Sequence, residues 1–200
     1  MKAKTLGIIT FLSILLIGCA QETVNIDVMH DQGKPVMALD YRDFDQAASQ
    51  LVQSMLASGA LKKEGGGRYI IAKGRIINDT MQRIDTDQLM AKIEIEILRS
   101  GQAVMTRAVG ADADKLIHEA RELRDDEEFD QSTIAERGTL QAFNFSIKGK
   151  IFQRNIRYDK NLQQVEYYFQ LMLSDSVTGL TYWQDEVIVG KRGSNKSVSW

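Results

Sequence analysis

Apolar residues recur at helical spacing in three parts of the chain. The first stretch, 44–56, follows Asp40 and Asp43, either of which can cap a helix start. The second, 85–101, opens on an aspartate with capping-box spacing and ends on a glycine. The third, 112–129, is highly charged and keeps only a thin apolar seam. We therefore expect three helices, the last ending in a solvated run of acidic residues.

The last third of the chain changes to a period of two. Apolar and polar residues alternate in three segments separated by short turn signals, which predicts an antiparallel meander with one buried face. Three further strands are expected upstream. The fold class is therefore α+β, with helices covering one or both sides of a single, mostly antiparallel sheet. The expected strands are 36–39, 69–77, 102–109 and the meander segments 145–151, 165–173 and 182–189.

The amino terminus has the order of features of a lipoprotein signal peptide. Two lysines precede an apolar run of about a dozen residues, which is shorter than the roughly 20 residues needed to span a bilayer. The run ends in Leu16-Ile17-Gly18-Cys19, typical of a lipoprotein signal-peptidase site, in which the cysteine receives lipid before cleavage. We expect a signal peptide over 1–18 and a lipid anchor on Cys19. Ala20 after the cysteine favours the outer membrane of a Gram-negative host.

The remaining chain divides into three parts. A polar, aperiodic segment over 19–35 is predicted to be a flexible tether, 36–193 a single globular domain, and 194–200 a frayed tail. A formal net charge of −2 gives no reason to expect nucleic acid as a partner. The single cysteine excludes an intramolecular disulfide, so the core alone must hold the domain together.

Residue patterns for catalysis are missing from the sequence. Its two histidines, His30 and His118, lack the spacing of a metal site, and no nucleophile elbow occurs. The glycine triplet 65–67 precedes a strand rather than a helix, so it predicts a loop and not a phosphate site. The acidic pairs near Asp85 and in 125–128 fit helix capping and a solvated face. We expect no enzyme activity, metal, cofactor or small-molecule substrate.

Several arginines on apparently exposed positions are candidates for a protein interface. Arginine is enriched at such interfaces, and its forked donors suit carboxylate recognition. Ordinary solvated surface is the alternative for any one of them. The residues favoured for contact with an acidic partner are Arg75, Arg83, Arg124 and Arg154.

Several long strings of the sequence, spread over about residues 36–192, carry a resemblance to a known family. They include Ala38-Leu39-Asp40-Tyr41-Arg42-Asp43-Phe44, Lys73-Gly74-Arg75-Ile76-Ile77-Asn78-Asp79-Thr80-Met81-Gln82-Arg83-Ile84-Asp85-Thr86-Asp87-Gln88-Leu89, Phe129-Asp130-Gln131-Ser132-Thr133 and Gln164-Val165-Glu166-Tyr167-Tyr168-Phe169-Gln170-Leu171. Together these strings resemble the LpoB family of outer-membrane lipoproteins, which activate penicillin-binding proteins.

The resemblance implies a fold similar to the N-terminal domain of TolB and a non-enzymatic role. Such a lipoprotein faces the periplasm and binds a bifunctional, inner-membrane peptidoglycan synthase, whose activities in cell-wall synthesis it stimulates. Binding of that kind favours an active conformation of the partner.

The tether departs from the pattern of the family, whose synthase activators tend to carry a longer one. Only 16 residues separate Cys19 from Val36. Fully extended they reach about 55 Å, and as a flexible coil they span about 20–25 Å. A short tether leaves three alternatives: a protruding synthase, a cell wall close to the membrane, or another partner. A structural envelope lipoprotein serving another periplasmic assembly is therefore the second hypothesis, and a wall-modifying hydrolase the third.

Overall fold

The computed structural model describes residues 25–28, 33, 35–110 and 112–196. The chain forms two compact units, Met1–Gly33 and Lys34–Trp200, and every helix and strand described lies in the second. Cys19 and the predicted signal peptide fall outside the described residues. Among those that are described, no helix is long and apolar enough to cross a membrane.

The first helix, α2 (Tyr41–Ala57), begins and ends as its flanking residues predict. Asp40 is the N-cap, and the Asp43 carboxylate accepts the backbone N–H of Asp40 at 2.7 Å, completing a capping box. Gly59, just beyond the helix, has a φ of +78°, a conformation that costs glycine little. The apolar stripe of α2, from Phe44 to Met55, is buried.

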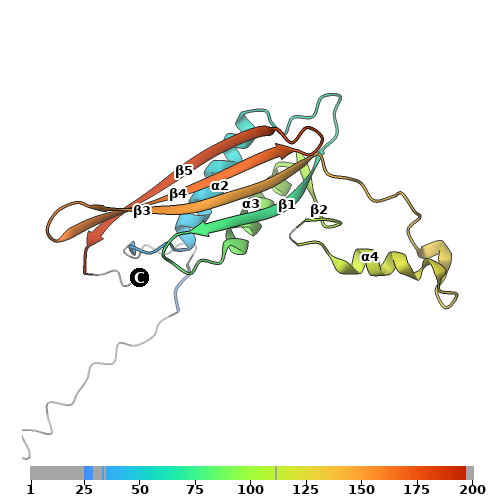
Figure 1. Cartoon of the computed structure of the whole chain (residues 1–200), viewed down its shortest axis with the longest axis horizontal. Coiled ribbons are helices and arrows are strands. Elements are labelled where there is room, and N and C mark those ends of the chain that lie inside the picture. The colour runs from blue at the N-terminus through green and yellow to red at the C-terminus, as the bar shows by residue number, and fades with distance from the viewer. Residues whose placement is uncertain (1–24, 29–32, 34, 111, 197–200) are drawn as a thin grey trace, which may run out of the picture. The chain divides into compact units, whose positions relative to one another are not determined.

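A single mixed sheet carries the rest of the fold (Figure 1). Its order is β2-β1-β3-β4-β5, with β1 parallel to both β2 and β3, and with β3, β4 and β5 antiparallel. The α+β class and the C-terminal meander are thus confirmed, and parallel pairing is confined to the first three strands of the order. The strands are β1 (Tyr69–Asp79), β2 (Ala103–Thr106), β3 (Phe145–Arg157), β4 (Leu162–Asp175) and β5 (Thr181–Ser194).

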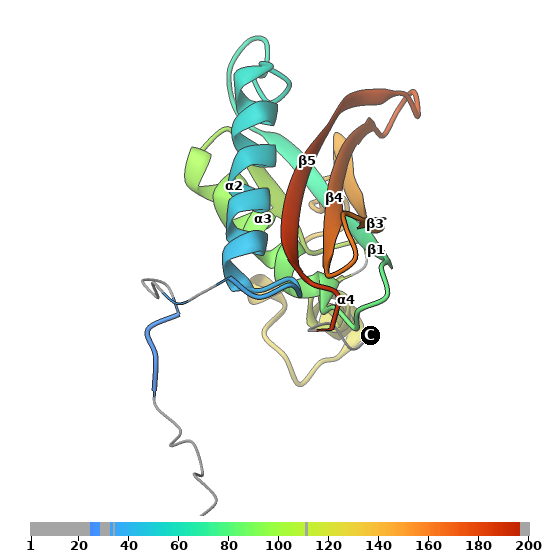
Figure 2. The same ribbon diagram turned by 90° about the vertical axis from the view of Figure 1, so that its left-hand side faces the viewer.

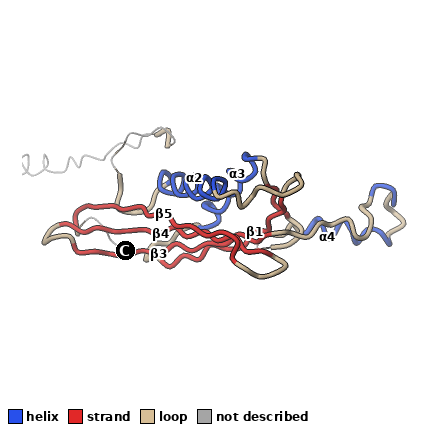
Figure 3. Tube along the Cα trace, turned by 90° about the horizontal axis from the view of Figure 1, so that it is seen from above, coloured by secondary structure: helices blue, strands red, loops and turns tan. Residues whose placement is uncertain are grey.

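The second helix, α3 (Thr86–Ser100), connects β1 to β2, as a parallel pair requires. Asp85 caps its start and Gly101 ends it in the left-handed conformation, as predicted. Figures 2 and 3 show α2 and α3 together on one face of the sheet, leaving the other face without a helix. We call that second surface the helix-free face.

The core lies between the two helices and the sheet. Alternate residues of strand β4, which lies between β3 and β5, are fully buried against the helices from Val165 to Leu173. Every residue of this core cluster falls between Phe44 and Val189, so the second unit contains its own core and can fold alone.

The segment 36–39 was predicted to be a strand, and this is wrong. Its backbone pairs with side chains from distant parts of the chain: Leu39 donates to Gln82 Oε1 at 3.2 Å, and Ala38 accepts from Lys191 Nζ at 2.7 Å. Met37 and Leu39 still pack on the core. Apolar content therefore predicted the burial correctly, whereas the hydrogen bonds are not those of a sheet.

Three other boundaries also differ from expectation. The strand expected over 102–109 is only Ala103–Thr106, because the chain leaves the sheet edge in a turn after four residues. The helix expected over 112–129 is limited to α4 (Lys115–Glu122), followed by a single 3₁₀ turn. Ser194, which was assigned to the predicted tail, is the last residue of β5.

Gly149 is a position where the sheet leaves no room for a side chain. A Cβ there would lie 2.6 Å from the carbonyl oxygen of Gln170 and 3.3 Å from Ile76. We expect Gly149→Ala to lower the free energy of unfolding by about 1–3 kcal/mol, measured by chemical denaturation. Gly190→Ala is the control, because a Cβ at Gly190 meets nothing within 4 Å. An equal loss in both variants would contradict the steric explanation.

Tyr167 links the start of the domain to the sheet. Its buried hydroxyl donates to the Met37 carbonyl at 3.0 Å and accepts from Gln82, and burial raises its pKa to about 12. Because the neutral form is favoured in the fold, the resulting stability is complete below about pH 10 and disappears as the pH rises towards 12.

We expect Tyr167→Phe to remove this pH dependence. Between pH 10 and 12 the wild type should lose about 2–3 kcal/mol more of its free energy of unfolding than the variant loses. Urea denaturation of both proteins across this range measures the difference. Parallel losses in the two proteins would show that Tyr167 is not the responsible group.

Candidate functional site

The long connection from β2 to β3 forms an arm that extends away from the sheet. We define the arm as residues 113–142; it includes α4, and none of its side chains is buried. Figures 1 and 3 show it extending past the end of the sheet. A connection between parallel strands usually packs its helix on the sheet. This one does not, which is why one sheet face has no helix.

The arm is held in shape by its own hydrogen bonds. The Arg121 guanidinium donates to the Glu136 carbonyl at 3.1 Å and to Thr139 Oγ1 at 3.0 Å, and Arg124 Nε donates to the Ala135 carbonyl at 2.8 Å. The Gln131 amide bridges carbonyls at the turn, including that of Asp126 at 2.7 Å. These bonds tie the returning chain to the outgoing helix, so the arm presents a defined surface.

The base of the arm is attached to the sheet by charged groups. Lys73, which is buried on β1, forms an ion pair with Asp112, and Arg107 lies 3.5 Å from Asp112 and 2.5 Å from Glu94. The bond from Lys73 holds the pKa of the Asp112 carboxyl below its usual value. His118 Nε2, on the arm, lies 2.8 Å from the Ala108 carbonyl, so this histidine also connects the arm to the chain that follows β2. The network positions the arm relative to the sheet.

The surface of the arm combines exposed apolar side chains with negative charge. Leu116 is 68% exposed, Phe129 46% and Leu140 40%. The arm carries nine acidic and four basic side chains, with four of the acids in succession at 125–128. Exposed apolar side chains beside charges of one sign are typical of protein interaction sites. A complementary partner surface would be apolar and cationic.

The four arginines predicted to bind a partner lie on four separate elements. Arg75 is exposed on β1, Arg83 is exposed in the loop before α3, and Arg154 is exposed on β3 opposite Glu166. Arg124 is in the arm, where its Nε bonds to the arm's own backbone. Arg124 is therefore a residue that shapes the arm, although the local sequence pattern suggested only an exposed cation.

The helix-free face carries a row of apolar side chains across three strands. Phe152, Tyr168 and Ile188 are register partners, and the rings of Phe152 and Tyr168 stack with centroids 4.6 Å apart. Beside this row a shallow groove of about 260 Å³ is lined by Ile77 and Met172, among others. Its borders are polar, with Lys150 paired to Asp79 at 2.6 Å. The face resembles a second contact surface more than a reaction site.

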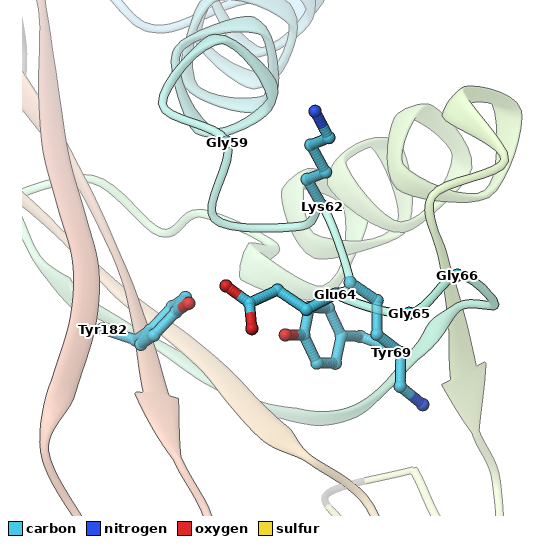
Figure 4. Close-up of a pocket in the computed structure, with 8 residues that line it drawn as sticks. Gly59, Lys62, Glu64, Gly65, Gly66, Tyr69 and Tyr182 are labelled. Carbon is cyan, nitrogen blue, oxygen red and sulfur yellow. The ribbon is translucent and has the colours of Figure 1, made fainter.

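A wider hollow lies at the other end of the sheet from the β3–β4 turn (Figure 4). It has about 1050 Å³ and is lined by the loop 59–66, Tyr69 and Tyr182. In Figure 4, Glu64 and Tyr69 face the hollow, while Lys62 points away from it. Burial raises the pKa of Tyr69. Besides Glu64, the titratable side chains of its lining are those of two lysines and two tyrosines, and the lining contains no histidine or cysteine.

Metal chemistry finds no support in the part of the chain that the structure describes. It contains no group of three or more histidine, cysteine, aspartate and glutamate side chains able to hold an ion. The acidic run at 125–128 is exposed on the arm, and Asp85 caps α3. Sequence reasoning missed the arm as a unit, because α4 has an ordinary helical pattern and nothing local reveals what it packs against.

Comparisons with known proteins give one family. The model of the family described as "Peptidoglycan-synthase activator LpoB" matches residues 43–189. No curated protein sequence gives a significant match.

Solved structures similar to this one include LpoB domains and a further lipoprotein. The C-terminal domains of LpoB from Salmonella enterica and Escherichia coli share 12% sequence identity with it, with TM-scores of 0.42 and 0.44, covering 74% of this chain and 98% of those chains. Lipoprotein GNA1162 from Neisseria meningitidis shares 10%, with a TM-score of 0.37, over 66% of this chain and 87% of that chain. The family model spans most of the domain, from within α2 into β5, and this chain belongs to the LpoB family.

Proposed function

We propose that this protein is a non-enzymatic outer-membrane lipoprotein that binds a periplasmic domain of a bifunctional peptidoglycan synthase and stimulates its activity. The single observation that carries the proposal is the match of the synthase-activator family over residues 43–189. Stimulation is a coupling free energy between binding and an active state of the partner.

The arm is the surface we assign to the synthase. It is prearranged by the bonds of Arg121 and Arg124, and it exposes Leu116 and Phe129 beside nine carboxylates. Prearrangement reduces the entropy lost on binding. The complementary surface on the synthase would be an apolar groove with a cationic rim. Arg75, Arg83 and Arg154, on the sheet and its loops, are proposed as a separate set of contacts to acidic groups.

The anchor on Cys19 is part of the same proposal and has its own experiment. Growth of the producing cell with radiolabelled palmitate should label the wild type and leave Cys19→Ser unlabelled. Fractionation of the envelope should place the labelled protein in the outer membrane. A wild type that carries no label would remove the anchor from the proposal.

Synthase binding is tested by capture from solubilised envelope with the tagged domain 36–200, which keeps β5 whole. We expect recovery of a bifunctional penicillin-binding protein, and faster glycan polymerisation when the purified domain is added to it. The short tether of 16 residues favours the alternative, a structural lipoprotein of another periplasmic assembly. Capture of such an assembly, with polymerisation unchanged, would replace the first function by the second.

A further inference from the structure

The sheet end opposite the arm forms a second distinctive surface, which we call the hairpin end. It consists of the β3–β4 hairpin, residues 154–161, together with Arg192 and Lys196 on the adjoining end of the chain. All eight residues 154–161 are exposed, so this part of the hairpin extends beyond the packed core. Asn195 donates to the carbonyls of Lys160 and Asn161 at 2.9 Å, which places Lys196 beside the hairpin.

The hairpin end is strongly cationic. It carries five basic side chains, Arg154, Arg157, Lys160, Arg192 and Lys196, and one carboxylate, Asp159. The Asp159 carboxylate is occupied by the turn itself, since it accepts the backbone N–H groups of residues 161 and 162 at 2.7 Å. Glu166 faces Arg154 across the strands and is the nearest further acid by register. The excess of positive charge remains available to an anionic partner.

Apolar and aromatic side chains lie among these cations. Ile156 is 39% exposed and Tyr158 is 54% exposed. The Arg192 guanidinium lies over the Tyr158 ring, 3.8 Å from its centroid. Tyrosine, arginine and lysine with an adjacent aliphatic residue are the combination found where proteins meet lipid headgroups, because each has an apolar body and a polar tip.

The chain enters the domain at this same end. A Cβ on Gly193 would lie 2.7 Å from Met37 Sδ, and Lys191 Nζ donates to the Ala38 carbonyl. Residue 37 therefore lies beside the last residues of β5, next to the hairpin. With Cys19 acylated, the 16 residues before Val36 typically span about 20–25 Å. The end of the domain nearest to the anchored lipid is then the cationic one.

We propose that the hairpin end rests on an anionic phospholipid surface, with Arg154, Arg157 and Lys160 against phosphate groups and Tyr158 at headgroup depth. The orientation of the domain in the cell rests on the proposed Cys19 anchor; the lipid contact is a property of the hairpin itself. The 13 residues of β3 span about 40 Å from the hairpin to the root of the arm. Contact at one end therefore directs the acidic arm away from the membrane, towards the cell wall.

Vesicle binding by the unlipidated chain 20–200 tests the proposal. We expect this chain to bind phosphatidylcholine vesicles containing about 30% phosphatidylglycerol, to ignore pure phosphatidylcholine, and to dissociate as salt is raised. Each cation near such a surface contributes roughly fivefold in affinity, so Arg154→Glu/Arg157→Glu/Lys160→Glu, which removes three cations and adds three carboxylates, should bind at least about a hundredfold more weakly. Failure of the wild-type chain to bind the anionic vesicles overturns the proposal.

A matched charge reversal controls for net charge. Lys62→Glu/Lys63→Glu/Arg68→Glu changes three exposed cations of the loop before β1, at the other end of the sheet, and should bind as the wild type does. An equal loss in this variant would show that total charge, and not the hairpin, governs binding. Circular dichroism and urea denaturation establish that both variants are folded.

A positional measurement avoids charge changes altogether. The chain from residue 20 has no cysteine, so Tyr158→Cys and Val177→Cys each accept a single environment-sensitive dye. Val177 is 91% exposed in the turn between β4 and β5, at the far end of the sheet. Anionic vesicles should shift the emission of the dye at 158 to the blue and leave the dye at 177 unchanged. The reverse result refutes the orientation. Neither test uses a synthase or the lipid anchor, so their failure leaves the proposed function standing.

Discussion

Asp43→Ala is expected to lower the free energy of unfolding by about 3–5 kcal/mol, which would leave the domain largely unfolded under mild denaturing conditions. The Asp43 carboxylate lies 2.5 Å from Lys191 Nζ, and their side chains are only 12% and 8% exposed. Removing the carboxylate leaves a buried ammonium group without its counter-ion. The variant also loses the capping-box bond to the Asp40 N–H. Urea denaturation followed by circular dichroism measures the loss.

Two further variants separate the buried charge from the fold around it. Asp43→Leu/Lys191→Met replaces the pair by apolar side chains and should recover most of the lost stability, because desolvating both charges offsets much of their attraction. Asp45→Ala is the matched control on the same helix. Asp45 pairs with Lys92 at 2.8 Å but is 56% exposed, so its loss should cost less than about 1 kcal/mol. Equal effects of Asp43→Ala and Asp45→Ala would contradict the explanation.

The Asp43–Lys191 pair also explains how the domain holds its first residues. Lys191 donates to Asp43 and to the Ala38 carbonyl, so one side chain of β5 fixes both the start of α2 and the segment before it. Tyr167 adds a bond to Met37 from the next strand. The first residues of the domain are thereby fixed beside the hairpin end.

Much of the fold was predictable because its signals are local. The apolar spacing of α2, the cap at Asp40 and the glycine at 101 each depend on residues within a few positions. The parallel pairing of β1 with β3 was not predictable, because it joins residues such as Ile71 and Phe145 whose neighbours carry no mark of the partner. The same holds for segment 36–39, whose hydrogen-bond partners lie 43 to 153 residues away.

The candidate surfaces were harder to predict than the helices. An arginine in a charged helix looks solvated from its neighbours alone, yet Arg124 bonds to a carbonyl 11 residues further on. Arg154 was expected to be exposed and is, and its neighbours Arg157 and Lys160 form the hairpin end with it. The charge run 125–128 was correctly expected to be solvated. The sequence pattern did not predict that this acidic run lies on an arm that also exposes apolar side chains to solvent.

Replacing the arm, residues 113–142, by a short glycine-serine linker is expected to abolish synthase binding and leave the domain folded. None of its side chains is buried, so the free energy of unfolding should change by less than about 1 kcal/mol. Binding should weaken by at least about a hundredfold, because the surface removed contains the exposed Leu116 and Phe129 and nine carboxylates. The synthase is immobilised on a sensor surface, and its affinities for the wild-type chain and for the arm-less chain are measured.

Point variants of the arm distinguish lost contacts from a lost shape. Leu116→Ser removes an exposed apolar side chain and should weaken binding by about tenfold or more without altering the arm. Arg124→Ala releases the Ala135 carbonyl and should act indirectly, weakening binding while increasing amide hydrogen exchange across 131–140. Val177→Ser is the control, since Val177 is equally apolar, 91% exposed and outside the arm. If the synthase binds the arm-less chain with wild-type affinity, the arm is not the contact surface. The helix-free face, with its apolar row of Phe152, Tyr168 and Ile188, would then be the surface to test.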